Sequence, residues 1–182
     1  MDLVRPFSLS AALLLVLSPP ARAADPAPSQ GPSPSAQEAA LAFERLRGLV
    51  GEWQGETPSG EKVAVTYRLA SGGSVVMEDL FPGTPHEMVT MYHLDGDALV
   101  LTHYCAMGNQ PRMRLAEATP KDLRFEFTGG TNLRPEKDGH IHSALLRFLD
   151  PTHLQAEWTV YRDGKPVGAN RYTIARATAA AK

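Results

Sequence analysis

Most of this chain consists of short segments in which apolar and polar residues alternate, separated by residues that favour turns. Val63, Val65, Tyr67 and Leu69 fall at every second position of one such segment, the spacing of a strand with one buried face. The sequence Asp95-Gly96-Asp97 between two apolar segments is typical of a hairpin turn. The first expected strand begins at 51, and the others cover 63–69, 75–81, 88–94, 98–104, a segment around 113–115, 123–127, 141–149, 154–161 and 167–174.

A helical pattern precedes the first strand. Ser35 followed by Glu38 has the spacing of a capping box. In this motif the side chain of each residue accepts a hydrogen bond from the backbone N–H of the other. Phe43, Leu46 and Leu49 then recur at helical spacing, and glycines among and after them end the helix. The sequence therefore predicts one short helix before the strands.

About ten short strands joined mainly by tight turns predict an all-β fold. Sequential hairpins give an up-and-down antiparallel sheet, and closing such a sheet removes its exposed edges. We therefore expect an antiparallel β-barrel of about ten strands with a short N-terminal helix.

The N-terminus has the pattern of a cleavable export signal. Arg5 precedes an apolar run over 7–17, and Ala21-Arg22-Ala23 supplies small residues for cleavage after Ala23. The run is shorter than the roughly 20 residues that span a bilayer. We expect a signal peptide over 1–23 and a periplasmic or secreted protein. The further divisions are a Pro/Ser-rich linker at 24–35, a barrel domain at 36–176 and a disordered tail at 177–182.

The composition limits the classes of partner that we expect. The chain has 182 residues and a formal net charge of −2, which gives no reason to expect binding to nucleic acid. No later apolar run predicts a transmembrane helix, and either a monomer or a homodimer is compatible with the sequence. Cys105 is the single cysteine, so an internal disulfide is excluded, and its apolar surroundings predict a structural, unreactive thiol.

A helix followed by Gly51-Glu52-Trp53 at the start of a meander resembles the calycins, which include lipocalins, fatty-acid-binding proteins and nitrobindin-like haem proteins. The resemblance implies that Trp53 closes one end of the barrel. The strings HYCAMGNQPRM, FTGGTNL, HIH and AEWTVYRDGK, within 46–176, resemble an uncharacterised lipocalin-like family of small exported bacterial proteins. That resemblance implies a calycin-type barrel and leaves the activity open.

Polar residues at the mouth of a barrel can orient an otherwise apolar ligand. The candidate ligand-binding residues are Tyr104, Asn109, Gln110, Arg112, Asn132, Glu157 and Trp158. Each also has a structural interpretation. Asn109, in the expected turn 108–111, suits a positive φ angle, Asn132 could cap a loop, and Glu157 could pair with Arg171.

Two histidines, His140 and His142, alternate along one expected strand and would point into the barrel about 7 Å apart. With His103, and with Glu157 as a further donor, they are candidate metal ligands for zinc. A single histidine in an apolar cavity could instead hold haem. The alternative is that these imidazoles are hydrogen-bonded within the barrel.

Sequence motifs of common enzymes are absent, including the Gly-x-Ser-x-Gly elbow, phosphate-binding glycine loops and His-Glu-x-x-His. A non-catalytic role is therefore favoured over a small barrel enzyme, and no catalytic residue is assigned. We expect a protein that holds a small, largely apolar molecule in its barrel, with a metal or haem site as the alternative.

Overall fold

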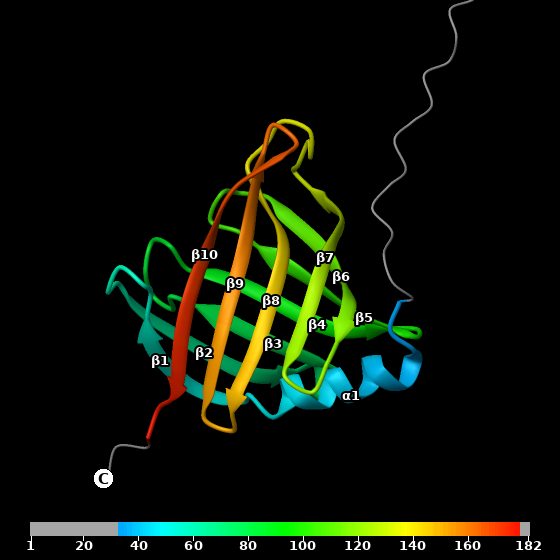
Figure 1. Cartoon of the computed structure of the whole chain (residues 1–182), viewed down its shortest axis with the longest axis vertical. Helices are drawn as coiled ribbons and strands as arrows, with labels where there is room; N and C mark the ends of the chain where they lie inside the picture. The colour runs from blue at the N-terminus through cyan, green and yellow to red at the C-terminus, as the bar shows by residue number, and fades with distance from the viewer. Residues whose placement is uncertain (1–32, 179–182) are drawn as a thin grey trace, which may run out of the picture.

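The computed structural model of the protein describes residues 33–178 (Figure 1). The expected signal peptide, most of the expected linker and the last four residues of the tail lie outside these described residues.

Ten antiparallel strands form a closed barrel in which each strand pairs with the next and β1 pairs with β10. This confirms the predicted all-β up-and-down barrel with a short helix before it. The strands are β1 (Gly51–Glu56), β2 (Lys62–Ala70), β3 (Val75–Leu80), β4 (Met88–Asp95), β5 (Ala98–Tyr104), β6 (Gln110–Ala118), β7 (Asp122–Thr131), β8 (His140–Asp150), β9 (His153–Arg162) and β10 (Lys165–Arg176). A single 3-10 turn, η1 (Ser71–Gly73), joins β2 to β3.

The helix α1 (Ala36–Arg47) begins with the predicted capping box. The Ser35 side chain accepts a hydrogen bond from the Glu38 amide, and the Glu38 carboxylate accepts one from the Ser35 amide. Gly48 caps the other end of the helix. One face of α1 is buried against β4, β5 and β6 at one end of the barrel (Figure 1). Its buried residues are Ala39, Ala42, Phe43 and Leu46.

Trp53 lies at the end that α1 covers, as the resemblance to calycins implied. Its side chain is buried, and its indole Nε1 donates a hydrogen bond to the Leu49 carbonyl at 2.7 Å. The guanidinium of Arg176 lies 4.5 Å from the centre of the indole ring. The same guanidinium donates to the carbonyls of Gly48 and Val50, so the last strand holds the segment between α1 and β1. The Trp53 side chain and the Arg176 guanidinium therefore close this end of the barrel.

The turn between β5 and β6 differs from the prediction. We expected the turn over 108–111 with Asn109 at a positive φ angle, but the turn comes earlier and Gly108 adopts the positive φ of 82°. The Cys105 amide donates to the Asn109 carbonyl and the Gly108 amide donates to the Cys105 carbonyl. Because this pattern closes the hairpin over 105–109, Gln110 already belongs to β6.

Within residues 33–178, no helix is long and apolar enough to cross a membrane.

Candidate ligand-binding cavity

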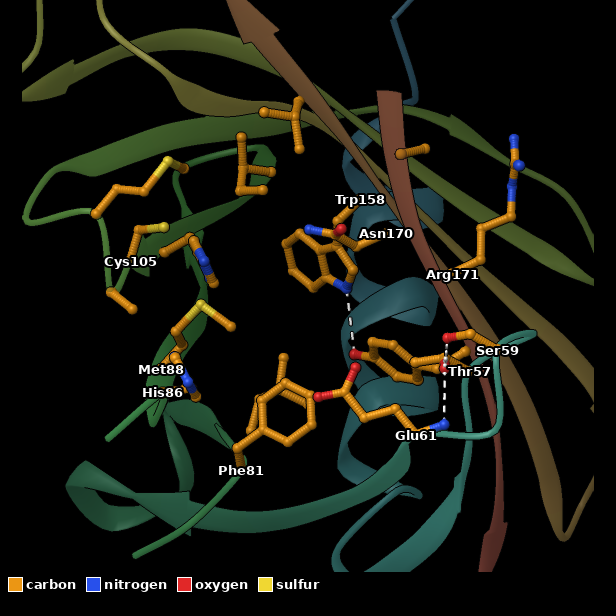
Figure 2. A pocket seen from close by; sticks show the side chains of 18 of the residues that line it. Thr57, Ser59, Glu61, Phe81, His86, Met88, Cys105, Trp158, Asn170 and Arg171 are labelled. Atoms are coloured by element: carbon orange, nitrogen blue, oxygen red, sulfur yellow. Dashed lines mark hydrogen bonds between the residues drawn. The ribbon is translucent and has the colours of Figure 1, made fainter. Parts of the chain in front are cut away.

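A cavity of about 760 Å³ lies inside the barrel, at the end opposite α1. The loops after β1, β3 and β5 contribute to its rim, and β8, β9 and β10 contribute to the facing wall. Figure 2 shows Met88 and Cys105 along one wall and Trp158 across from them. The apolar lining side chains are Pro58, Leu80, Phe81, Met88, Ala106, Met107, Ile141, Trp158, Val160 and Ala169. A volume in this range accommodates a small organic molecule.

His103 is a buried histidine of the cavity wall. It points inward from β5, is 2% exposed and packs against Trp158, with ring centres 5.1 Å apart and ring planes tilted by 32°. Its Nδ1 shares a hydrogen bond of 2.9 Å with the Thr90 hydroxyl, while its Nε2 finds no partner among the described residues. Burial lowers the pKa of His103 to about 4, so the imidazole is neutral near pH 7.

A buried polar network lies beneath the cavity and centres on Glu78 of β3. The carboxyl accepts hydrogen bonds from the Tyr92 hydroxyl at 2.6 Å and from the Tyr172 hydroxyl at 3.3 Å. The hydroxyl of Tyr67 lies near the same carboxyl but has no hydrogen bond of standard geometry. Burial raises the pKa of Glu78, and the hydrogen bonds from the tyrosines offset part of this rise.

Tyr172 connects this network to the cavity that it lines. Its hydroxyl accepts a hydrogen bond from Trp158 Nε1 at 3.2 Å while donating to Glu78. The Tyr172 hydroxyl is therefore held by one hydrogen bond that it accepts from Trp158 and one that it donates to Glu78.

Phe81 stands out because its backbone adopts a φ of 57°, a left-handed conformation that bulky side chains rarely take. Its amide donates to the Ala64 carbonyl at 2.9 Å, which holds the residue at the end of β3. Its ring lines the cavity (Figure 2). Strained backbone of this kind is often found at binding sites.

Polar residues surround the cavity mouth. They are Thr57, Ser59, Glu61, His86, Asn170 and Arg171; Thr57 is half-buried and the others are exposed. Arg171 already has a partner, because its Nε donates to the Glu157 carboxylate at 2.6 Å. The hydrogen bond from Arg171 lowers the pKa of Glu157. Glu157 therefore makes the ion pair that was one of its two sequence interpretations.

Of the seven residues proposed from the sequence as ligand contacts, Trp158 lines this cavity. Tyr104 is 48% exposed on the outer side of β5, and Arg112 is exposed on β6. Asn109 is buried, and its side-chain amide donates to the Gly139 carbonyl at 2.8 Å, joining the β5–β6 turn to the start of β8.

Gln110 and Asn132 interact with each other away from the cavity lining. The Gln110 side-chain carbonyl accepts hydrogen bonds from the Thr131 hydroxyl at 2.7 Å and from the Asn132 amide at 3.3 Å. Asn132, with a φ of 50°, occupies a left-handed position after β7. These two residues therefore stabilise the loop between β7 and β8.

The expectation that His140 and His142 point into the cavity is corrected by a β-bulge. The β8–β9 register shifts between Ile141 and Ser143, and Ile141 is the residue that lines the cavity. The His140 Nδ1 donates to the Asp138 carbonyl at 2.9 Å, which leaves its Nε2 to accept a hydrogen bond of 3.0 Å from His142 Nδ1. The histidines are thus hydrogen-bonded within the fold, as the alternative interpretation held.

His140 and His142 belong to an aromatic cluster with Phe127 and Tyr161. The His142 ring stacks on Tyr161 with centres 3.8 Å apart, and Phe127 lies 4.9 Å from both imidazoles. The pairing between β7 and β8 ends at Glu126 and Ser143 and does not continue to Phe127 and His142. The cluster therefore packs where these two strands separate.

Among residues 33–178, no group of three or more His, Cys, Asp or Glu side chains comes together to hold a metal ion. The proposed set of His103, His140 and His142 is accordingly not assembled, since His103 packs on Trp158 and the other two pack on Tyr161. A haem needs only one axial imidazole, and the Nε2 of His103 is the donor in the cavity that fits this requirement.

Cys105 is half-buried and lines the cavity beside Met88 (Figure 2). Burial raises the pKa of its thiol, and the resulting neutral thiol is a weak nucleophile.

The sequence interpretation missed Glu78, Thr90 and Tyr172. The signal for Glu78 was present, because it lies between Val76 and Leu80 at positions of the same parity and so points inward from β3. The ladders place Thr90 opposite Glu78 on one side and opposite His103 on the other. Strand pairing would have revealed this polar row across β3, β4 and β5.

No family model and no curated protein matches the chain. A protein of unknown function from the DUF3598 family of Nostoc punctiforme is similar in structure, with 13% identity over 72% of this chain and a TM-score of 0.49. The chain spans 49% of that protein. Rv2717c from M. tuberculosis is also similar, with 16% identity over 75% of this chain, 98% coverage of Rv2717c and a TM-score of 0.49.

Proposed function

We propose that the protein binds a small, largely apolar molecule inside its barrel and that it does so without catalysis. The observation that supports this proposal is the cavity of about 760 Å³, whose wall is largely made of apolar side chains. Ligand sites typically combine such a wall with a few fixed polar groups. His103 and Tyr172 are the buried polar residues of this wall.

Burial of apolar ligand surface would supply the binding free energy. Each square ångström removed from water contributes about 25 cal/mol before the cost of association is subtracted. A fixed wall reduces that cost, and the hydrogen bonds of Trp158, Tyr172 and Glu78 hold one side of the cavity in place. The export signal expected at 1–23 would make the protein a periplasmic or secreted carrier of calycin type.

A titration with N-phenyl-1-naphthylamine, a neutral apolar fluorophore, tests the proposal. We expect saturable fluorescence enhancement with the full chain. Ala169→Phe adds a ring at a small, half-buried position of the cavity wall and should weaken binding at least tenfold. Ala64→Phe adds the same ring at an exposed position on β2 and is the matched control. Equal binding by both variants, or no saturation, would refute the proposal.

Haem is a second candidate ligand, and the free Nε2 of His103 is the observation that favours it. The neutral imidazole, oriented by Thr90 through Nδ1, would hold the iron, and the apolar wall would exclude water from the macrocycle. Haem would supply ligand-binding or redox chemistry at its iron. A Soret band that appears on haem addition and is lost in His103→Phe would support this candidate, whereas an unchanged spectrum in that variant would reject it.

A further inference from the structure

The buried part of the cavity offers a ligand one hydrogen-bonding atom. Five buried side-chain atoms lack a partner among the described residues, and they belong to Arg45, Tyr67, Asp79, His103 and Asn109. His103 is the member of this set that lines the cavity, and the unpartnered atom is its Nε2. An enclosed polar atom without a partner is costly, so a ligand group that bonds to it gains affinity.

The neighbouring polar groups of the wall are already engaged. Trp158 Nε1 donates to the Tyr172 hydroxyl, and that hydroxyl donates to Glu78. Thr90 is engaged with the other nitrogen of His103. A ligand therefore meets a mostly apolar wall with one specific polar position.

The buried wall also lacks a counterion for a charged ligand. His103 is enclosed as the neutral imidazole, and Arg171 is paired with Glu157 on the strand surface. The carboxylate of Glu61 and the imidazole of His86 lie at the exposed mouth of the cavity. Because an ion taken from water without a partner is strongly disfavoured, a neutral ligand fits the deep cavity.

We propose that the ligand is a neutral molecule with an aromatic or alicyclic body and one hydroxyl group, which hydrogen-bonds to Nε2 of His103. This inference rests on the proposed function and names the chemical class of its ligand. A hydroxyl suits the site because it can both donate and accept. The Thr90 hydroxyl can likewise donate to or accept from Nδ1, so the hydroxyl group matches Nε2 in either tautomer of the ring.

The planar side chains of the cavity support an aromatic body. Trp158 and Phe81 both line it, and Trp158 lies directly beside the imidazole that would bind the hydroxyl. A ring packed against these surfaces would bury its faces while its hydroxyl reaches His103.

The test measures three related compounds by calorimetry at pH 7.5 with the full chain: 2-naphthol, naphthalene and 2-naphthoate. We expect 2-naphthol to bind about tenfold more tightly than naphthalene, because its hydroxyl satisfies Nε2. We expect 2-naphthoate to bind most weakly of the three. In His103→Phe, the preference for 2-naphthol over naphthalene should disappear, while naphthalene still binds.

A second measurement does not depend on any variant. The ring nitrogen resonances of His103 in the wild-type protein should shift at Nε2 when 2-naphthol binds and change little when naphthalene binds. Equal affinity for 2-naphthol and naphthalene, or an unshifted Nε2 with 2-naphthol, would overturn the ligand class while leaving the proposed function intact. Preference for 2-naphthoate would overturn the requirement for a neutral ligand. Failure of all three compounds, together with failure of N-phenyl-1-naphthylamine, would overturn the proposed function itself.

Discussion

At the scale of single residues, burial accounts for the pKa shifts of His103 and Glu78 inside the barrel. Burial disfavours the charged form of every ionisable group. It lowers the pKa of the base His103 and raises the pKa of the acid Glu78. An uncharged imidazole in the cavity wall and a carboxyl biased toward its neutral form beneath it suit an apolar ligand.

The depressed pKa of His103 predicts loss of stability in acid. In the unfolded chain the His103 imidazole binds a proton near pH 6.5, whereas in the folded protein it does so only near pH 4. The free energy of unfolding should therefore fall by about 3 kcal/mol as the pH drops from 6.5 through 4. Urea unfolding at several pH values, compared with His103→Phe, measures this contribution. The prediction is wrong if both proteins lose stability in parallel.

Glu78 predicts the opposite trend. Its folded-state pKa lies above the ordinary value of 4.5, so its contribution to stability is present below that pH and declines as the pH rises through the folded-state pKa. Each unit of pKa shift corresponds to about 1.4 kcal/mol. Glu78→Gln keeps an acceptor for Tyr92 and should lack this decline. Denaturant unfolding of both proteins between pH 4 and pH 8 would show it, and identical pH profiles would contradict it.

At the scale of elements, alternation and turn residues together predicted the strands, but alternation did not predict which side chains face inward where the ladder is irregular. The inward positions of β3 and β5 follow the simple two-residue period, which places Glu78 and His103 inside. In β8 the bulge between Ile141 and Ser143 shifts that period, so Ile141 lines the cavity in place of the two histidines. A bulge depends on pairing with the neighbouring strand, and a period read along one strand does not contain that information.

The junction between β1 and β10, where the barrel closes, depends on a glycine. A Cβ atom on Gly55 would lie 1.9 Å from the Thr173 carbonyl oxygen, and both atoms belong to paired strands. Gly55→Ala should therefore destabilise the protein by about 3 kcal/mol. Gly60→Ala is the control, because the added Cβ meets nothing within 4 Å. We expect it to destabilise the protein by about 1 kcal/mol, the cost of an alanine at the positive φ of 84°. Equal melting temperatures for the two variants would refute the prediction.

At the scale of the whole molecule, the two ends of the barrel differ. Trp53, α1 and the guanidinium of Arg176 fill one end, while the other end retains the cavity. The resemblance of Gly51-Glu52-Trp53 after a helix to the calycins implied the closed end. The open end could not be predicted in the same way, because its residues come from separate strands and loops. Trp158 was identified from the sequence, whereas Glu78, Thr90 and Tyr172 come together only once the barrel closes.

The measurement that tests the central claim most directly is a map of ligand-induced shifts in the NMR spectrum of the full chain. Titration with N-phenyl-1-naphthylamine should shift the indole resonance of Trp158 and the methyl resonances of Leu80 and Ile141, all of which line the cavity. The rings of His142 and Tyr161, in the cluster outside the cavity lining, should stay unchanged. Saturable shifts confined to the cavity wall are the predicted result. Absence of saturable shifts, or shifts centred on His142 and Tyr161, would contradict a ligand-binding barrel interior.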